Sequence, residues 1–145
     1  MDKEAYIKQK YRENLYSWAN LAILSGGIGV LLLSPLDYFT NPVHFTRFLF
    51  YRFATAACFA FLYLLNKRWA QQVHQGVLAL FAGLVVSAMI SLMIRDLGGH
   101  TSTYYPGYVI VLIFVIGVVP LTFRVSLCAA SLIYLTYLVP ILLYD

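Results

Sequence analysis

The sequence has few charged residues. Asp, Glu, Lys and Arg together make up 11% of its 145 residues, whereas soluble domains carry about 25%. Hydrophobic residues make up 61%, far more than one small core can bury, and the mean hydropathy is +0.77. The shortage of charge excludes a soluble enzyme and a disordered chain, and it predicts an integral membrane protein.

Cysteine and histidine are also scarce. The two cysteines, Cys58 and Cys128, lie in separate apolar runs with no Cys-x-x-Cys spacing. This excludes a disulfide framework and does not favour metal or redox chemistry. His44, His74 and His100 fall at the edges of apolar runs and lack a matched carboxylate pattern. We therefore expect no metal ion, no haem and no other cofactor.

The sequence lacks a catalytic constellation. It has no Ser/His/Asp or Cys/His arrangement in a supporting context, no pair of intramembrane carboxylates and no phosphate loop. Inverted repeats and paired broken helices, which point to transport, are missing as well, so a small transporter is a weak alternative. The basic residues do not form one patch, and nucleic acid is not an expected partner. We expect that the chain itself is not an enzyme.

Long apolar runs dominate the sequence. A membrane-spanning helix takes roughly 20 apolar residues, and the runs here are separated by short polar segments. We predict an all-α, polytopic transmembrane helix bundle with five spans, at about 18–36, 45–65, 76–94, 108–123 and 127–143.

The segment before the first span is predicted to be amphipathic. Four residues share one stripe at helical spacing: Ile7, Tyr11, Leu15 and Trp18. Lysine and arginine residues surround this stripe, and a helix with aromatic and basic side chains favours the lipid headgroup zone. We therefore divide the chain into a cytoplasmic interfacial helix at residues 1–18 and a transmembrane bundle at residues 19–145.

The basic residues predict the orientation of the bundle. With five spans, seven of the ten fall on one side, and Lys and Arg mark the cytoplasmic side. The N-terminus is then cytoplasmic and the C-terminus lies outside. The seven are Lys3, Lys8, Lys10, Arg12, Lys67, Arg68 and Arg124; the three on the outer side are Arg47, Arg52 and Arg95.

Small residues predict where helices pack closely. In the third span they recur every four residues, which predicts a helix in the bundle interior. Two small-xxx-small pairs in the first span favour close approach of another helix. The stripe is Ala79, Gly83, Ser87 and Ser91; the pairs are Ala22/Gly26 and Ser25/Gly29.

Arg52 is the residue whose position most needs an explanation. It lies about seven residues into the second span, roughly 10 Å along the helix at 1.5 Å per residue. A cation at that depth is costly unless it pairs or meets water. Asp37 or Asp96 could pair with it. Such a pair is either a lock between helices or the floor of a ligand pocket, and the sequence leaves both open.

The polar loop after the third span completes the predicted site. Gly98 and Gly99 permit a tight turn, and Pro106 is well placed to open the fourth span. Arginine suits an anionic or carbonyl group, while histidine and tyrosine would hydrogen-bond and pack against a lipophilic portion. The predicted ligand-binding residues are Asp37, Arg52, Arg95, Asp96, His100, Tyr104 and Tyr105.

Residues 98–107, GGHTSTYYPG, resemble a known signature. The pattern GG-x-T-S-x-Y-Y-x-G lies between spans three and four in membrane-embedded sensory input regions of some bacterial histidine kinases and nucleotide cyclases. Leu36-Asp37 followed by Arg52 is similar to that family's first loop and second helix, and the resemblance covers roughly residues 19–143. Pro106 stands where the family often has a small residue, and the chain has no sixth span and no output domain.

The resemblance implies a sensor of the bacterial inner membrane. Such a module would bind a small-molecule or lipophilic ligand near its outer face and relay a helix rearrangement to a cytoplasmic kinase or cyclase domain. It implies membrane lipids as surroundings and a homodimer formed through a parent protein. Signalling inward needs an even number of spans, so we expect a sixth span in a longer, six-span parent. The alternative is a structural subunit that packs against partner membrane proteins.

Overall fold

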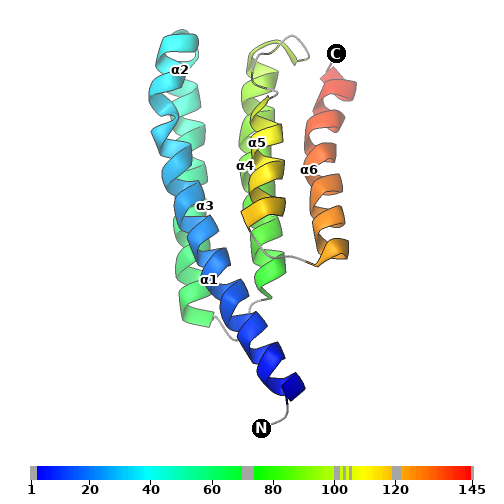
Figure 1. The fold of residues 1–145 in the computed structure, drawn as a ribbon. Helices are drawn as coiled ribbons and strands as arrows, with labels where there is room; N and C mark the ends of the chain where they lie inside the picture. Colours follow the sequence, from blue (N-terminus) through cyan, green and yellow to red (C-terminus); the bar gives the residue numbers. More distant parts are fainter. Residues whose placement is uncertain are drawn as a thin grey trace.

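The chain folds into a bundle of helices. A computed structural model describes residues 3–69, 74–99, 102, 104, 106–118 and 122–144, and these residues contain helices and no strands. Figure 1 shows the helices running side by side, with the N-terminus and the C-terminus at opposite ends of the bundle. The helical segments are α1 (Lys3–Leu32), α2 (Ser34–Thr40), α3 (Phe45–Trp69), α4 (Gln75–Asp96), α5 (Pro106–Val118) and α6 (Phe123–Tyr144).

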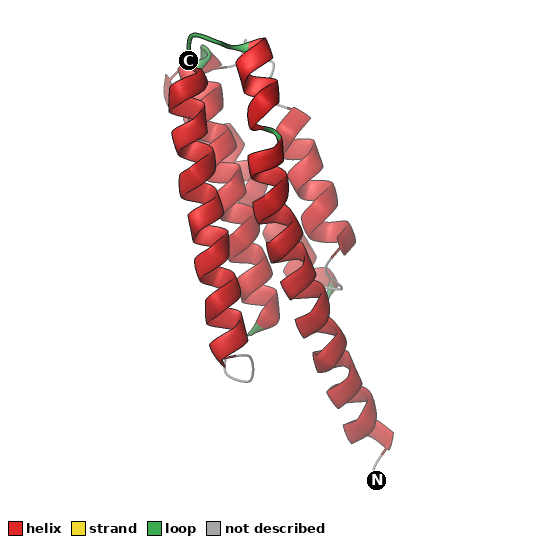
Figure 2. Cartoon of the chain, turned by 90° about the vertical axis from the view of Figure 1, so that its left-hand side faces the viewer, coloured by secondary structure: helices red, strands yellow, loops and turns green. Residues whose placement is uncertain are grey.

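The predicted interfacial helix and first span form one continuous helix, α1. Its N-terminal part projects beyond the rest of the bundle (Figure 2). α1 ends before Pro35, because proline lacks an N–H and its ring clashes with the carbonyl one turn earlier. α2 then starts with this proline in its first turn. The predicted spans and the resemblance leave Asp37 in a loop between helices, and this is wrong: Asp37 lies in α2, which ends where the Asn41 N–H donates to the Asp37 carbonyl.

α4 is the central helix, as its small-residue stripe predicts. It packs against α1, α3, α5 and α6. Half of its most apolar stretch is buried inside the bundle, compared with 28% for α1–α2 and for α3. A Cβ at Gly83 would lie 2.9 Å from Val115 of α5 and 3.3 Å from Ile133 of α6, so glycine is needed there for close packing.

The small residues of α1 have two different roles. A Cβ at Gly26 would lie 2.7 Å from the Phe59 ring, which confirms a close approach between α1 and α3. Gly29 does not follow the prediction, since a Cβ there would meet nothing within 4 Å. Ser25 is exposed and donates its hydroxyl to the Leu21 carbonyl, at 2.7 Å. Only the first of the two pairs therefore serves helix packing.

Three helical stretches are long and apolar enough to cross a membrane: Tyr6–Thr40, which joins α1 and α2, Phe45–Trp69 and Gln75–Asp96. Two further apolar stretches, Pro106–Gly117 and Phe123–Val139, are shorter. The structure therefore confirms the all-helical bundle and spanning length for the first three predicted spans.

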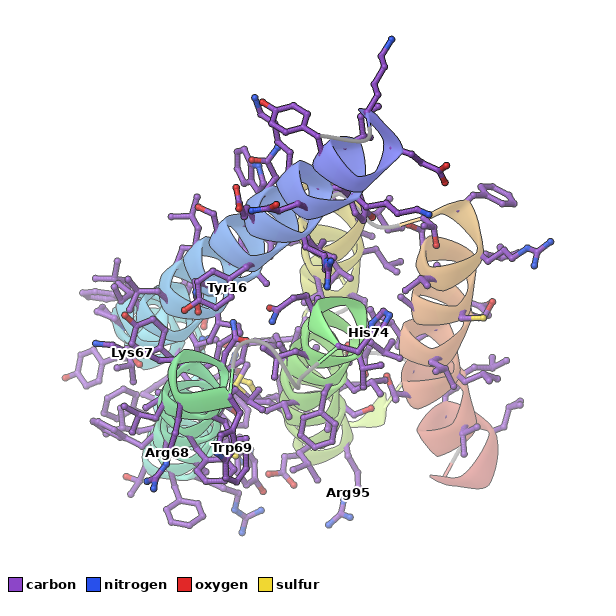
Figure 3. All side chains as sticks on the ribbon, turned by 90° about the horizontal axis from the view of Figure 1, so that it is seen from below. Tyr16, Lys67, Arg68, Trp69, His74 and Arg95 are labelled. Atoms are coloured by element: carbon purple, nitrogen blue, oxygen red, sulfur yellow. The ribbon has the colours of Figure 1, made fainter. Side chains whose placement is uncertain are left out.

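The helix ends that carry basic residues gather at one end of the bundle. Seen from below, the end of α3 carries Lys67 and Arg68, close to the start of α4 at His74 (Figure 3). The start of α1 and the start of α6, where Arg124 lies, are at this same end (Figure 1). We call it the N-terminal end. The opposite end, with α2 and the loop after α4, is the α2 end.

Candidate functional site

Arg52 and Asp37 form a buried ion pair at the α2 end. Arg52 Nε donates to Asp37 Oδ2 at 2.5 Å, and Arg52 Nη2 donates to Asp37 Oδ1 at 2.9 Å. Arg52 is 4% exposed and Asp37 is 0% exposed. The two parallel bonds use the planar fork of the guanidinium group. The pairing predicted for Arg52 is confirmed with Asp37 and is wrong with Asp96.

The end of α1 supports this ion pair. Arg52 Nη1 donates to the Val30 carbonyl at 2.9 Å. The last four carbonyls of a helix lack intrahelical partners and carry the negative end of the helix dipole. Val30 is among them, so the helix break that Pro35 imposes supplies both an acceptor for Arg52 and the turn that places Asp37.

Tyr104, from the loop after α4, closes the same cluster. Its hydroxyl donates to Asp37 Oδ1 at 2.7 Å and lies 3.2 Å from Thr40 Oγ1. Its ring meets Phe48 edge-on at 5.7 Å. Burial, together with the hydrogen bond to the Asp37 carboxylate, raises the pKa of Tyr104. We call Asp37, Arg52 and Tyr104 the ionic cluster.

The turn that delivers Tyr104 depends on two glycines. Gly98 and Gly99 have φ angles of 89° and 64°, in the left-handed region that other residues rarely adopt. Further along the same loop, the Tyr104 N–H donates to Ser102 Oγ at 3.2 Å. The predicted tight turn is confirmed, and α5 begins at Pro106 as expected.

Asp96 belongs to a different group of side chains. It pairs with Arg47 at 3.3 Å and accepts a hydrogen bond from the Tyr51 hydroxyl at 3.0 Å. Sequence reasoning had included neither Arg47 nor Tyr51 in the site. Both lie on α3. Tyr51 directly precedes Arg52, so two adjacent residues of one helix bind different carboxylates: Tyr51 binds Asp96 and Arg52 binds Asp37. Arg95 is exposed and points away from the bundle (Figure 3). The predicted site residues His100 and Tyr105 lie outside the described residues.

A cavity of about 450 Å³ lies beside the ionic cluster, between α1–α2, α4 and α5. Arg52, Tyr104 and Thr40 line one end of it, and the remaining wall is almost entirely apolar. This volume is within the range of small-molecule sites, about 300–1,000 Å³, which are typically apolar with a few placed polar groups. Of the predicted ligand-binding residues, Arg52 and Tyr104 line this cavity and Asp37, Arg95 and Asp96 do not; the long apolar wall was not predicted.

Small residues line much of this cavity. They come from α1 and α4; at Gly29 the space beside the residue is open, whereas Gly26 and Gly83 also let Phe59 and Val115 approach closely. The small residues are Ala19, Ala22, Gly26 and Gly29 on α1, and Ala79, Ala82 and Gly83 on α4. The small-residue pattern was therefore the available signal, but it was interpreted as helix packing alone.

A second buried polar cluster lies toward the N-terminal end. Asn66 Nδ2 donates to Asn20 Oδ1 at 3.0 Å, and Gln75 Nε2 donates to Asn66 Oδ1 at 2.8 Å. Asn66 is fully buried. These amides join α1, α3 and α4, and among the described residues none of the three lines the cavity. We call them the amide cluster. Sequence reasoning missed it, although amides beside long apolar runs could have indicated it.

Hydroxyl groups join the C-terminal helices to α4. The Tyr108 hydroxyl donates to the Ser87 carbonyl at 2.8 Å and lies 2.7 Å from Ser91 Oγ. Ser91 Oγ also lies 2.5 Å from the Thr136 carbonyl. Polar bonds of this kind hold helices together in an apolar surrounding. They make α4, α5 and α6 one packed unit on the far side of the cavity from α1–α2.

Comparison with known proteins does not assign the chain to a family. No protein-family model, curated protein or solved structure matches the chain. In the part of the chain that the structure describes, no group of three or more His, Cys, Asp or Glu residues could hold a metal ion. The geometry of the ionic cluster and its cavity therefore carries the functional argument.

Proposed function

We propose that this chain is the membrane-embedded input module of a bacterial signal-transduction protein. Its cavity would bind a small lipophilic ligand near the outer face of the inner membrane. The observation that carries the proposal is the cavity itself, which ends on a buried arginine and a tyrosine. A lock between helices needs the Asp37–Arg52 pair but does not need an apolar space of about 450 Å³ beside it.

The placement in the membrane is part of the same proposal. Five crossings, with α5 and α6 as the fourth and fifth, put the two ends of the chain on opposite sides. The basic helix ends then face the cytoplasm, in keeping with the positive-inside rule. The ionic cluster lies on the outer side, where a ligand from outside the cell or from the outer leaflet could reach it.

The mechanism follows from the helices on either side of the cavity. We call α1, α2 and α3 one unit and α4, α5 and α6 the other, although α4 also packs against α1 and α3. Tyr104 bonds to Asp37 between the two units, as Asp96 and Gln75 of α4 bond to side chains of α3. A ligand that binds better to one relative position of these units shifts the population toward it. In the family that residues 98–107 resemble, an attached cytoplasmic kinase or cyclase domain would receive this shift, in a dimer formed through the parent protein.

The alternative, an assembly subunit, is less well supported. A subunit of that kind would turn the small-residue stripe of α4 toward a partner protein. The stripe instead packs within this chain, with Ala79 and Ser87 buried and Gly83 against α5 and α6. We therefore retain the sensor as the proposed function.

The native cysteines offer a direct test. Cys58 on α3 and Cys128 on α6 are both exposed and lie in different units. Spin labels on them would report the distance between the units for the protein in nanodiscs of synthetic lipid. We expect the distance distribution to change when an apolar extract of bacterial membranes is added. An unchanged distribution would contradict a relay between the units.

The matched control uses two glycines with open space beside them. A Cβ at Gly29 or at Gly117 would meet nothing within 4 Å, and of these two only Gly29 lines the cavity. Gly29→Leu should abolish the response to the extract because the new side chain occupies the cavity. Gly117→Leu should leave the response intact. Equal effects of the two substitutions would remove the cavity from the mechanism.

A further inference from the structure

We propose that the ligand is an uncharged, single-chain amphiphile with a carbonyl head, which enters the cavity sideways from the bilayer. This inference rests on the proposed function, because it assumes that the cavity is a ligand site. It is carried by three features of the described residues: the length of the cavity, the charge at its polar end and the position of its opening.

The cavity is long and polar at one end only. Its wall extends from Ala19 on α1 to Leu33, just after the end of α1, which is about 21 Å at 1.5 Å per residue. Its polar lining at the α2 end comes from Thr40, Arg52 and Tyr104. The Ser25 hydroxyl, which lies midway, is already bonded to a backbone carbonyl. This shape suits one hydrocarbon chain with its head toward Arg52, and it does not suit a two-tailed phospholipid.

The charge at the polar end favours an uncharged head. Asp37 already neutralises Arg52 through two hydrogen bonds. An anionic head would therefore add an uncompensated negative charge next to a buried carboxylate, which is costly away from water. A carbonyl oxygen brings no such charge.

The donors at the polar end match a carbonyl acceptor. Arg52 uses three of its N–H groups on Asp37 and Val30, and a guanidinium group has five. Tyr104 directs its only hydroxyl proton to Asp37, and Thr40 donates to the Leu36 carbonyl. The remaining guanidinium N–H groups are thus the donors that a ligand oxygen would meet.

The opening of the cavity faces sideways. Leu33 and Leu36 on one edge and Ile110 on the other are 50%, 56% and 65% exposed, and all three line the cavity. They belong to α1–α2 and α5, at the side of the bundle. In a membrane this side meets the hydrocarbon tails, so a ligand dissolved in the bilayer can enter without crossing water.

Photo-crosslinking of the full chain in nanodiscs tests this inference. The probe is methyl laurate with a diazirine in its chain, and labelled residues are mapped by mass spectrometry. We expect labels on the cavity walls of α1, α4 and α5. Gly29→Leu should reduce them about tenfold or more, a difference of about 1.4 kcal/mol in binding, and Gly117→Leu should leave them unchanged.

Competition against the same probe, with the wild-type protein at pH 9, tests the head group. Unlabelled methyl laurate should compete at a concentration about tenfold lower than laurate, and dodecane should compete less well than methyl laurate. Stronger competition by laurate or by a phospholipid would overturn the uncharged single-chain ligand and leave the cavity as a ligand site. If none of these molecules reduces the labelling, and Gly29→Leu does not either, both this inference and the proposed function are overturned.

Discussion

The ionic cluster and the amide cluster solve the same problem at different ends of the bundle. Each joins helices through buried polar side chains in an apolar surrounding. Asp37, Arg52 and Tyr104 do so with two full charges, whereas Asn66 and its two amide partners do so with none. Burying a charge costs several kcal/mol even in a good pair, and burying a bonded amide costs much less.

The difference separates a packing role from a binding role. If the α2 end needed only a polar contact between helices, amides of the kind used at the N-terminal end would suffice. The ionic cluster instead places arginine N–H groups at the end of a cavity. A guanidinium group holds its donors in a fixed plane and carries more of them than an amide does. Variants of each cluster can separate a packing role from a binding role.

Breaking the ion pair should have the largest effect on stability. Asp37→Asn leaves the Arg52 charge buried and uncompensated, and such changes cost about 3–5 kcal/mol. The double variant Asp37→Leu with Arg52→Met removes both charges and should recover most of this loss. The free energy of unfolding in bicelles measures both.

The double variant also separates folding from binding. It should fold and yet fail to be labelled by the methyl laurate probe, because the donors at the polar end are gone. A double variant as unstable as Asp37→Asn would mean that buried charge is not what makes the single change costly. A double variant that is labelled normally would remove Arg52 from the ligand site.

Breaking the amide cluster should have a smaller effect. Asn66→Leu removes two hydrogen bonds and leaves two amide partners to be satisfied elsewhere, which we expect to cost about 1–2 kcal/mol. Because none of these amides lines the cavity, labelling by the methyl laurate probe should be unchanged in the same sample. A loss of labelling with a preserved fold would show that the two clusters are coupled, contrary to the comparison.

The sequence was sufficient to predict the central position of α4 and a carboxylate partner for Arg52, although it left two candidates for that partner. Helical spacing of small residues placed α4 at the centre, since such residues let backbones approach. The depth of Arg52 in an apolar run favoured a carboxylate partner, and Asp37 was one of two within reach. These predictions succeed because each follows from a strong local rule of the bilayer environment.

Local rules of this kind could not predict the shape of the cavity, nor that Asp96 would lie in a different cluster from Asp37 and Arg52. A small side chain either lets a neighbour approach or leaves a space. Gly26 lets the Phe59 ring approach, whereas nothing approaches Gly29 and the space beside it stays open. The partner of Asp96 depends on the rotation of α3, which turns Tyr51 and Arg47 toward Asp96 and turns Arg52 toward Asp37. Both outcomes are set by packing between distant segments, which a single sequence does not encode locally.

Removing the Tyr104 hydroxyl should have the smallest effect, and its dependence on pH makes it specific. At pH 8, Tyr104→Phe should cost about 1 kcal/mol, since it removes one partly buried hydrogen bond to a carboxylate. Burial and the bond to Asp37 raise the pKa of Tyr104 above its ordinary value of 10.0. Because the pKa of Tyr104 is higher in the folded protein than in the unfolded chain, the folded protein holds the Tyr104 proton more tightly. The contribution of Tyr104 to the free energy of unfolding therefore falls as the pH rises beyond about 10. Unfolding free energies of the two proteins should therefore converge above pH 10, and a difference that stays constant would mean that Tyr104 does not donate to Asp37.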